Sequence, residues 1–160
     1  MAAYNFTLVP ANPHWSAGDT QVVTAYYDLN GVALAQNDTI TATNMIPVNG
    51  VSIYDLYCTH TELDTNATPT GTYNIGDTVS ATRFIASAPM GVNGVTTTGF
   101  QMYNRFNSAP TSASGVTTAG IGYIYTSNAS LVLTVNGVVA TGATTGVIFL
   151  TVIYRCTGIS

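Results

Sequence analysis

The chain has no lysine and few charges of any kind: three arginines and seven acids in 160 residues. Charged residues form 6% of the sequence, against about 25% in an ordinary soluble domain. Proteins that bind nucleic acid neutralise phosphates with clustered basic side chains, and Arg83, Arg105 and Arg155 are too scattered to form a cluster. A phosphate-binding P-loop and a Schiff-base enzyme each need a lysine, so both are excluded.

Long apolar runs and targeting signals are missing too. The longest apolar stretch, residues 147–154, is interrupted by Thr151 and has the length of a strand. A membrane-spanning helix needs about 20 apolar residues. The first five residues contain no basic side chain, which argues against a secretory signal. We therefore expect no membrane partner and synthesis in a cytoplasm.

What is abundant favours β-structure. Val, Ile, Tyr and Thr dominate, and these residues suit the pleated surface of a sheet. Asn-Gly, which supplies the positive φ angles of tight hairpin turns, occurs four times, beginning at Asn30, Asn49, Asn93 and Asn136. The pattern predicts strands over residues 21–27, 32–35, 38–43, 51–61, 71–75, 120–125 and 147–155, and a hairpin over 130–141.

These elements predict an all-β fold: a single-domain β-sandwich or jelly roll with one short helix. Asp77 can cap that helix, which would run over residues 79–85. Residues 1–18 contain Pro10 and Pro13 and lack strand periodicity, so we expect an extended N-terminal arm before a domain of residues 19–160.

The best candidate for a metal site is the segment that contains Cys58, His60, Glu62 and Asp64. If the strand persists, these alternate side chains share one face, where neighbours could hold a metal. The alternative is a strand end that runs into a polar turn with its acids in water. A calcium loop would need glycine where Ala67 stands. No second ligand group of matched spacing occurs, so we predict no metal and no cofactor.

Catalytic patterns are equally weak. Glu62 and Asp64 could form a glycosidase pair, although adjacent acids in a turn are far commoner. His14 lies in the proline-rich arm, where an aromatic anchor is a simpler interpretation than a base. The serine-hydrolase and dinucleotide-binding motifs are both missing. We predict no catalytic residues and no enzyme activity. Cys58 and Cys156 are either two buried thiols or a disulfide, and the disulfide would accompany a secreted sandwich domain.

Two segments resemble small structural proteins of tailed double-stranded DNA bacteriophages. The first, residues 56–85, runs from an alternating strand through Glu62-Leu63-Asp64-Thr65-Asn66 to Ile75-Gly76-Asp77 and Thr82-Arg83-Phe84-Ile85. The second holds the Leu131-Val132-Leu133-Thr134-Val135 strand and the final apolar strand after Gly146. The resemblance covers about half the chain and implies a virion protein, of the capsid decoration or cement type, with a sandwich or jelly-roll fold.

As implied by this resemblance, the partner would be the lattice of the major capsid protein, bound by a homo-oligomer such as a trimer. The arm and the aromatic loop of residues 100–106 are apolar, so we expect them to contact the capsid or neighbouring copies. The contact residues predicted there are Tyr4, Phe6, Trp15, Phe100, Tyr103 and Phe106. The alternative is a head-fibre or tail-associated module that stacks host surface glycans on its many tyrosines.

Overall fold

A computed structural model describes residues 1–9, 18–47, 50–91, 101–104 and 122–157, with the side chains of 101–104 left aside. The strands are β1 (Ala3–Asn5), β2 (Thr7–Leu8), β3 (Thr20–Asp28), β4 (Thr39–Ile46), β5 (Val51–His60), β6 (Thr72–Asp77), β7 (Ile85–Pro89), β8 (Gln101–Asn104), β9 (Ile124–Tyr125), β10 (Ala129–Val135) and β11 (Val147–Cys156).

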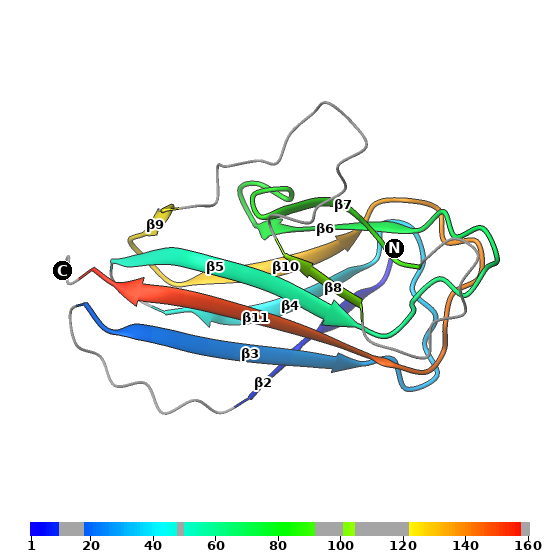
Figure 1. The fold of residues 1–160 in the computed structure, drawn as a ribbon, viewed down its shortest axis with the longest axis horizontal. Coiled ribbons are helices and arrows are strands. Elements are labelled where there is room, and N and C mark those ends of the chain that lie inside the picture. The colour runs from blue at the N-terminus through cyan, green and yellow to red at the C-terminus, as the bar shows by residue number, and fades with distance from the viewer. Residues whose placement is uncertain (10–17, 48–49, 92–100, 105–121, 158–160) are drawn as a thin grey trace.

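These strands form two sheets that pack face to face, which confirms the predicted all-β sandwich. The first sheet has the order β1-β4-β10-β6-β7 and the second has the order β2-β3-β11-β5-β8, with β9 paired to β5. Figure 1 shows β3, β11 and β5 side by side in one layer, with β4 and β10 in the layer behind them. Most neighbouring strands are distant in sequence: β11, for example, pairs with both β3 and β5.

The core lies between the sheets and is built from alternate side chains of their strands. In β10 the inward residues Leu131, Leu133 and Val135 are fully buried. β11 differs, because its inward residues are buried while Phe149 and Ile153 on the other side are apolar as well. A strand that is apolar on both sides is expected where both faces of a sheet are covered.

The N-terminal segment joins the two sheets along one side of the sandwich. β1 pairs parallel with β4 in the first sheet, and β2 pairs antiparallel with β3 in the second. Between them, Phe6 donates its backbone N–H to the Thr41 carbonyl at 2.9 Å and buries its ring. Residues 3–8 of the predicted arm therefore belong to the sheets, whereas residues 10–17 lie outside the described ranges.

The predicted short helix is wrong. Asp77 does accept the backbone N–H groups of Val79 and Ser80, as a helix cap would, at 2.9 and 2.7 Å. The chain then turns back, because Phe84 donates its N–H to the Ile75 carbonyl at 3.0 Å and Ile85 begins β7. No helix forms within the described ranges, and none there could span a membrane.

Three strand predictions also need correction. The hairpin over 130–141 has its first strand, β10, but residues 138–141 cross to the β5–β6 loop instead of returning beside β10. Residues 32–35 form no strand, although Asn30 and Gly31 adopt the expected positive φ angles of 42° and 89°. The strand predicted over residues 120–125 is reduced to Ile124–Tyr125, and residues 120–121 lie outside the description. For residues 138–141 the cause is Asp64, whose carboxylate accepts the N–H groups of Ala140 and Thr141.

Candidate functional site

The outward side of the second sheet carries apolar side chains where a sheet that faces water usually carries polar ones. Tyr26 of β3 lies opposite Phe149 of β11, and Val22 lies opposite Ile153. The ring centroids of Tyr26 and Phe149 are 6.4 Å apart. Val22 and Tyr26 are 54% and 37% exposed. We call these four residues, with Tyr57 on the neighbouring β5, the aromatic face. Thr24 and Thr151 lie between them with their hydroxyls 3.0 Å apart, and Asp55 lies opposite Ile153.

The outward side of the first sheet has a different character. There Thr39 lies opposite Thr134, and Thr41 lies opposite Val132. Asn74 follows on β6 and accepts the backbone N–H of Ser87 at 2.8 Å. The threonine hydroxyls suit contact with water, whereas Asn74 is buried and holds β7 through Ser87. Both outward sides carry threonines, but large apolar side chains lie opposite one another across β3 and β11 of the second sheet.

Of the residues predicted from the sequence to make contacts, Tyr4, Phe6 and Tyr103 lie in the described part of the chain. The Phe6 side chain is only 7% exposed, so it stabilises the core and offers little surface. Tyr4 is half-buried, with its ring centroid 5.5 Å from that of Tyr27. Tyr103 lies in β8, opposite Cys58 in backbone register. The other predicted contact residues, Trp15, Phe100 and Phe106, lie outside the described residues.

Sequence reasoning missed Val22, Phe149 and Ile153 as surface residues. A signal for two of them was present in the unbroken apolar pattern of residues 147–154, because a strand covered on one face only should alternate. Val22 gave no such signal, since its outward position depends on the register between β3 and β11. Register across distant strands cannot be read from a local pattern.

The segment proposed as a metal site does not gather its side chains. Cys58 and His60 point into the core and are fully buried, and β5 ends at His60. Glu62 is half-buried in the loop that follows, while the carboxylate of Asp64 turns inward and is also fully buried. Within the described residues, no group of three or more potential ligands could hold a metal ion. The alternative interpretation, a strand end that runs into a polar turn, fits these residues. Its acids were expected to lie in water, however, and Asp64 is buried.

Asp64 instead organises the loops at this end of the sandwich. Its two carboxylate oxygens accept backbone N–H groups at 2.9 to 3.3 Å from both the β5–β6 loop and the β10–β11 loop. The donors are Asn66, Thr70, Gly71, Ala140 and Thr141. Burial raises the pKa of Asp64, but these donors outweigh it, so the net pKa is below its usual value.

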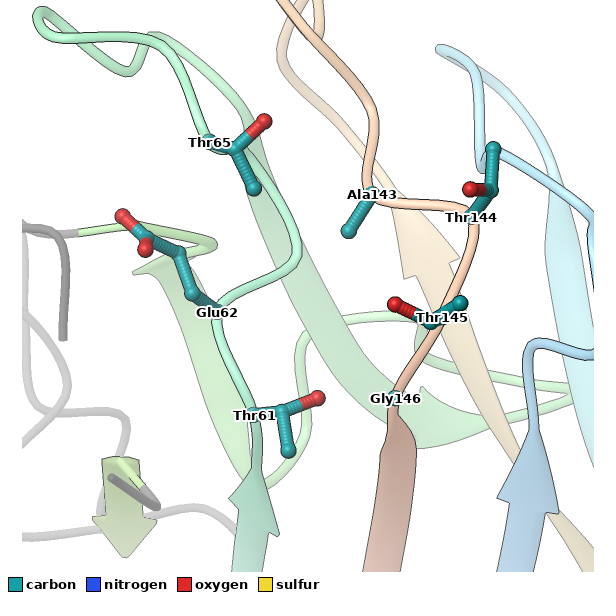
Figure 2. Close-up of a pocket in the computed structure, with 7 residues that line it drawn as sticks. All are labelled: Thr61, Glu62, Thr65, Ala143, Thr144, Thr145 and Gly146. Carbon is teal, nitrogen blue, oxygen red and sulfur yellow. The ribbon is translucent and has the colours of Figure 1, made fainter. Parts of the chain in front are cut away.

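The same two loops enclose an open pocket of about 500 Å³ (Figure 2). Its walls are threonines on both sides, Thr61 and Thr65 facing Thr144 and Thr145. Figure 2 shows the carboxylate of Glu62 directed away from the segment of residues 143–146. The lining thus offers threonine hydroxyl groups and the carboxylate of Glu62.

The two cysteines are free and buried. Cys58 lies opposite Leu150 on β11, whereas Cys156 lies opposite Val51 on β5, so the two residues are far apart along the same strand pair. Burial raises the pKa of Cys58 to about 12, although a hydrogen bond with Tyr73 lowers it in part. Cys58 therefore remains a thiol at neutral pH, and the buried-thiol interpretation is the one that fits.

His60 makes folding stability depend on pH. Its Nδ1 donates to the Thr61 carbonyl at 2.6 Å, and its ring meets that of Tyr73 edge to face with centroids 5.3 Å apart. Burial lowers the pKa of His60 to about 4, although the Thr61 carbonyl opposes this change. In the unfolded chain the His60 imidazole binds a proton near pH 6.5, whereas in the folded chain it binds one only near pH 4.

We expect the free energy of unfolding to fall by about 3 kcal/mol as the pH falls from 6.5 to 4, because each pKa unit corresponds to about 1.4 kcal/mol. Urea unfolding at several pH values would measure this. His60→Leu should remove most of the dependence, and His14→Gln should leave it in place. An equally steep dependence in His60→Leu would contradict the assignment.

Comparison with known proteins gives no match to a family model and none to a curated sequence. Among solved structures, a chain of the cyanophage Pam1 capsid asymmetric unit matches with a TM-score of 0.60 and 25% identity, over 92% of each chain. A chain from the capsid of Ralstonia phage GP4 matches with a TM-score of 0.67 and 20% identity, over 99% of this chain and 100% of that one. The resemblance to phage structural proteins is confirmed. It rests on the whole sandwich and extends beyond the two segments that suggested it.

Proposed function

We propose that this protein is a non-enzymatic structural component of a phage virion that binds the capsid lattice as a decoration or cement protein. The observation that carries the proposal is the match over 92% of both chains to a chain of a phage capsid. That match supports a location in the virion. We propose synthesis in the host cytoplasm before assembly. The partner we propose is the lattice of the major capsid protein.

The aromatic face is the surface we propose for this attachment. Protein interfaces have apolar, aromatic centres. Tyr26, Phe149 and Ile153 supply such side chains on β3 and β11, with Asp55 beside Ile153 as an acid at the same surface. Each copy would gain only moderate binding energy from this area. Repetition over a lattice, or the linkage of copies in an oligomer, makes moderate contacts durable. Because the face carries few charges, we expect attachment to be insensitive to salt.

Val22→Thr combined with Ile153→Thr tests this face. The two residues are cross-strand neighbours, and threonine keeps the β-branched shape that suits a strand. Each exchange loses roughly 1 kcal/mol of apolar burial, so we expect binding about tenfold weaker or worse. Occupancy on particles that lack the wild-type protein, measured by quantitative mass spectrometry, is the readout.

Val132→Thr is the matched control, because Val132 is an apolar residue on the outward side of the other sheet. It should leave occupancy unchanged. Full occupancy with Val22→Thr/Ile153→Thr would contradict the assignment of the aromatic face. The copy number of the wild-type protein tests the wider proposal: hundreds per particle fit lattice decoration, whereas a few fit a tail or vertex component.

The N-terminal arm and the loop of residues 100–106 remain proposed contacts as well. A deletion of residues 1–15 would not test the arm cleanly, because it removes β1, β2 and the buried ring of Phe6. Two variants avoid this problem because they change no residue of β1 or β2: Trp15→Ala tests the arm, and Phe100→Ala combined with Phe106→Ala tests the loop. Each should lower the occupancy on particles if its segment binds the capsid. The homo-oligomer, proposed to be a trimer, is tested by sedimentation of the pure protein; a monomer at high concentration would contradict it.

A further inference from the structure

A second pocket lies at the opposite end of the sandwich from the threonine pocket. It has a volume of about 310 Å³ and lies between the turn after β6 and the segment from β9 to the start of β10. We call it the end cleft. β9 pairs with the first residues of β5, Tyr125 opposite Val51, whereas the threonine pocket begins at Thr61, just beyond the last residue of β5. Figure 1 shows β9 at the end of the molecule where β5 begins.

The floor of the end cleft is a buried ionic cluster. Asp77 accepts a hydrogen bond from Arg83 Nε at 2.6 Å and another from the Tyr125 hydroxyl at 2.7 Å, both through the same carboxylate oxygen. The guanidinium carbon of Arg83 lies 3.9 Å from the ring centroid of Tyr123. The Tyr123 and Tyr125 rings meet nearly at right angles with centroids 4.8 Å apart. These contacts fix the floor in one arrangement.

A buried ion pair is unexpected in this chain. Only ten side chains are charged, three basic and seven acidic, yet two of them form this pair, with side chains 10% and 4% exposed. Buried ion pairs contribute little net stability compared with apolar packing, because both charges lose their hydration. Such a cluster beneath a cleft is typical of a preorganised binding site.

The chemistry of the lining indicates the class of ligand. Tyr123 and Ile124 offer apolar surface, and Ser127, Asn128 and Ser130 offer hydroxyl and amide groups. The charge of Asp77 is neutralised by Arg83, so the cleft has no net negative charge that would attract a cation. Its lining contains no basic residue that would bind an anion. A neutral ligand with both C–H surface and hydroxyl groups fits this lining. The volume is at the small end of ligand sites, enough for one or two rings.

We propose that the end cleft binds a neutral saccharide unit, with its ring against Tyr123 and Ile124 and its hydroxyls toward Ser127 and Asn128. The site is separate from the aromatic face and goes beyond capsid attachment. A virion protein with both surfaces would hold the capsid with one side and present a glycan site at one end.

A glycan array that carries neutral and sialylated oligosaccharides, followed by saturation-transfer NMR on a saccharide that binds, tests the proposal. We expect neutral glycans to bind, and we expect sialylated glycans to bind no more tightly than their neutral counterparts. Ser127→Ala combined with Asn128→Ala removes two exposed polar side chains at the cleft. Two lost hydrogen bonds should weaken binding about tenfold or more.

Thr144→Ala combined with Thr145→Ala, in the threonine pocket, is the matched control and should leave glycan binding unchanged. The Ser127→Ala/Asn128→Ala variant should unfold at the same temperature as the parent and keep full occupancy on particles, which separates this proposal from capsid attachment. Three results would each overturn it: no neutral glycan bound, binding only to anionic glycans, or binding unaffected by the cleft variant.

Discussion

Asp64→Asn is expected to destabilise the protein by about 3 kcal/mol or more, although it changes only one buried oxygen into an amide group. Asp64 is fully buried and accepts five backbone N–H groups. An asparagine would turn an –NH₂ group toward donors such as Gly71 and Ala140, which would then lack an acceptor. Each unsatisfied buried donor costs about 1–3 kcal/mol.

Thermal and urea unfolding of the purified variant would measure this loss. For a chain of this size, 1 kcal/mol shifts Tm by roughly 2–4 °C, so a fall of at least about 6 °C is expected. Glu62→Gln is the matched control, because Glu62 is a half-buried acid two residues away, and it should change stability by less than about 0.5 kcal/mol. An Asp64→Asn variant as stable as Glu62→Gln would contradict the organising role of Asp64.

Asp77→Asn is expected to cost about 3–5 kcal/mol, since it leaves the guanidinium of Arg83 buried without its counter-charge. It also weakens the acceptor for the Tyr125 hydroxyl, which ties β9 to the turn after β6. Burial raises the pKa of Asp77, but hydrogen bonds from Tyr125, Arg83 and the backbone lower it by more. The net pKa is therefore below its usual value. Its contribution is therefore complete above the ordinary carboxyl range and is lost as the pH falls through the lowered pKa.

A double-mutant cycle isolates the pair. Asp77→Asn/Arg83→Met should be more stable than the sum of the two single losses implies, by about 0.5–3 kcal/mol, because no buried charge is left unpaired. Asp19→Asn, at an exposed acid before β3, is the control and should be nearly neutral. Strictly additive losses would show that the two side chains do not stabilise each other.

The sequence predicted the sandwich well because its signals are local. β10 and β11 follow from alternation and apolar content in consecutive residues. Prediction from local sequence failed after Asn136, where residues 138–141 leave β10. The cause is Asp64, more than seventy residues away in sequence, which binds the N–H groups of Ala140 and Thr141. Local prediction failed in the same way after Asp77, where the pairing of Phe84 with Ile75 overrides the helical pattern.

The candidate surfaces could be predicted only in part. Tyrosine content indicated contact surfaces, yet Tyr125 is buried in the ionic cluster while Tyr26 faces outward. Which side of a strand faces the core depends on pairing with strands distant in sequence. The end cleft joins the turn after β6 to residues 123–130, so no contiguous motif could reveal it.

The position of β11 in the second sheet has a consequence for how the protein is made. β11 lies between β3 and β5, yet it follows every other strand of the described chain. On the ribosome, β3 and β5 emerge long before the strand that joins them, so the second sheet can form only after residues 147–156 have been synthesised. Until then the nascent chain exposes unpaired strand edges, which are prone to associate with other chains. Folding of the second sheet is thus expected to depend on rapid completion of the chain or on chaperones.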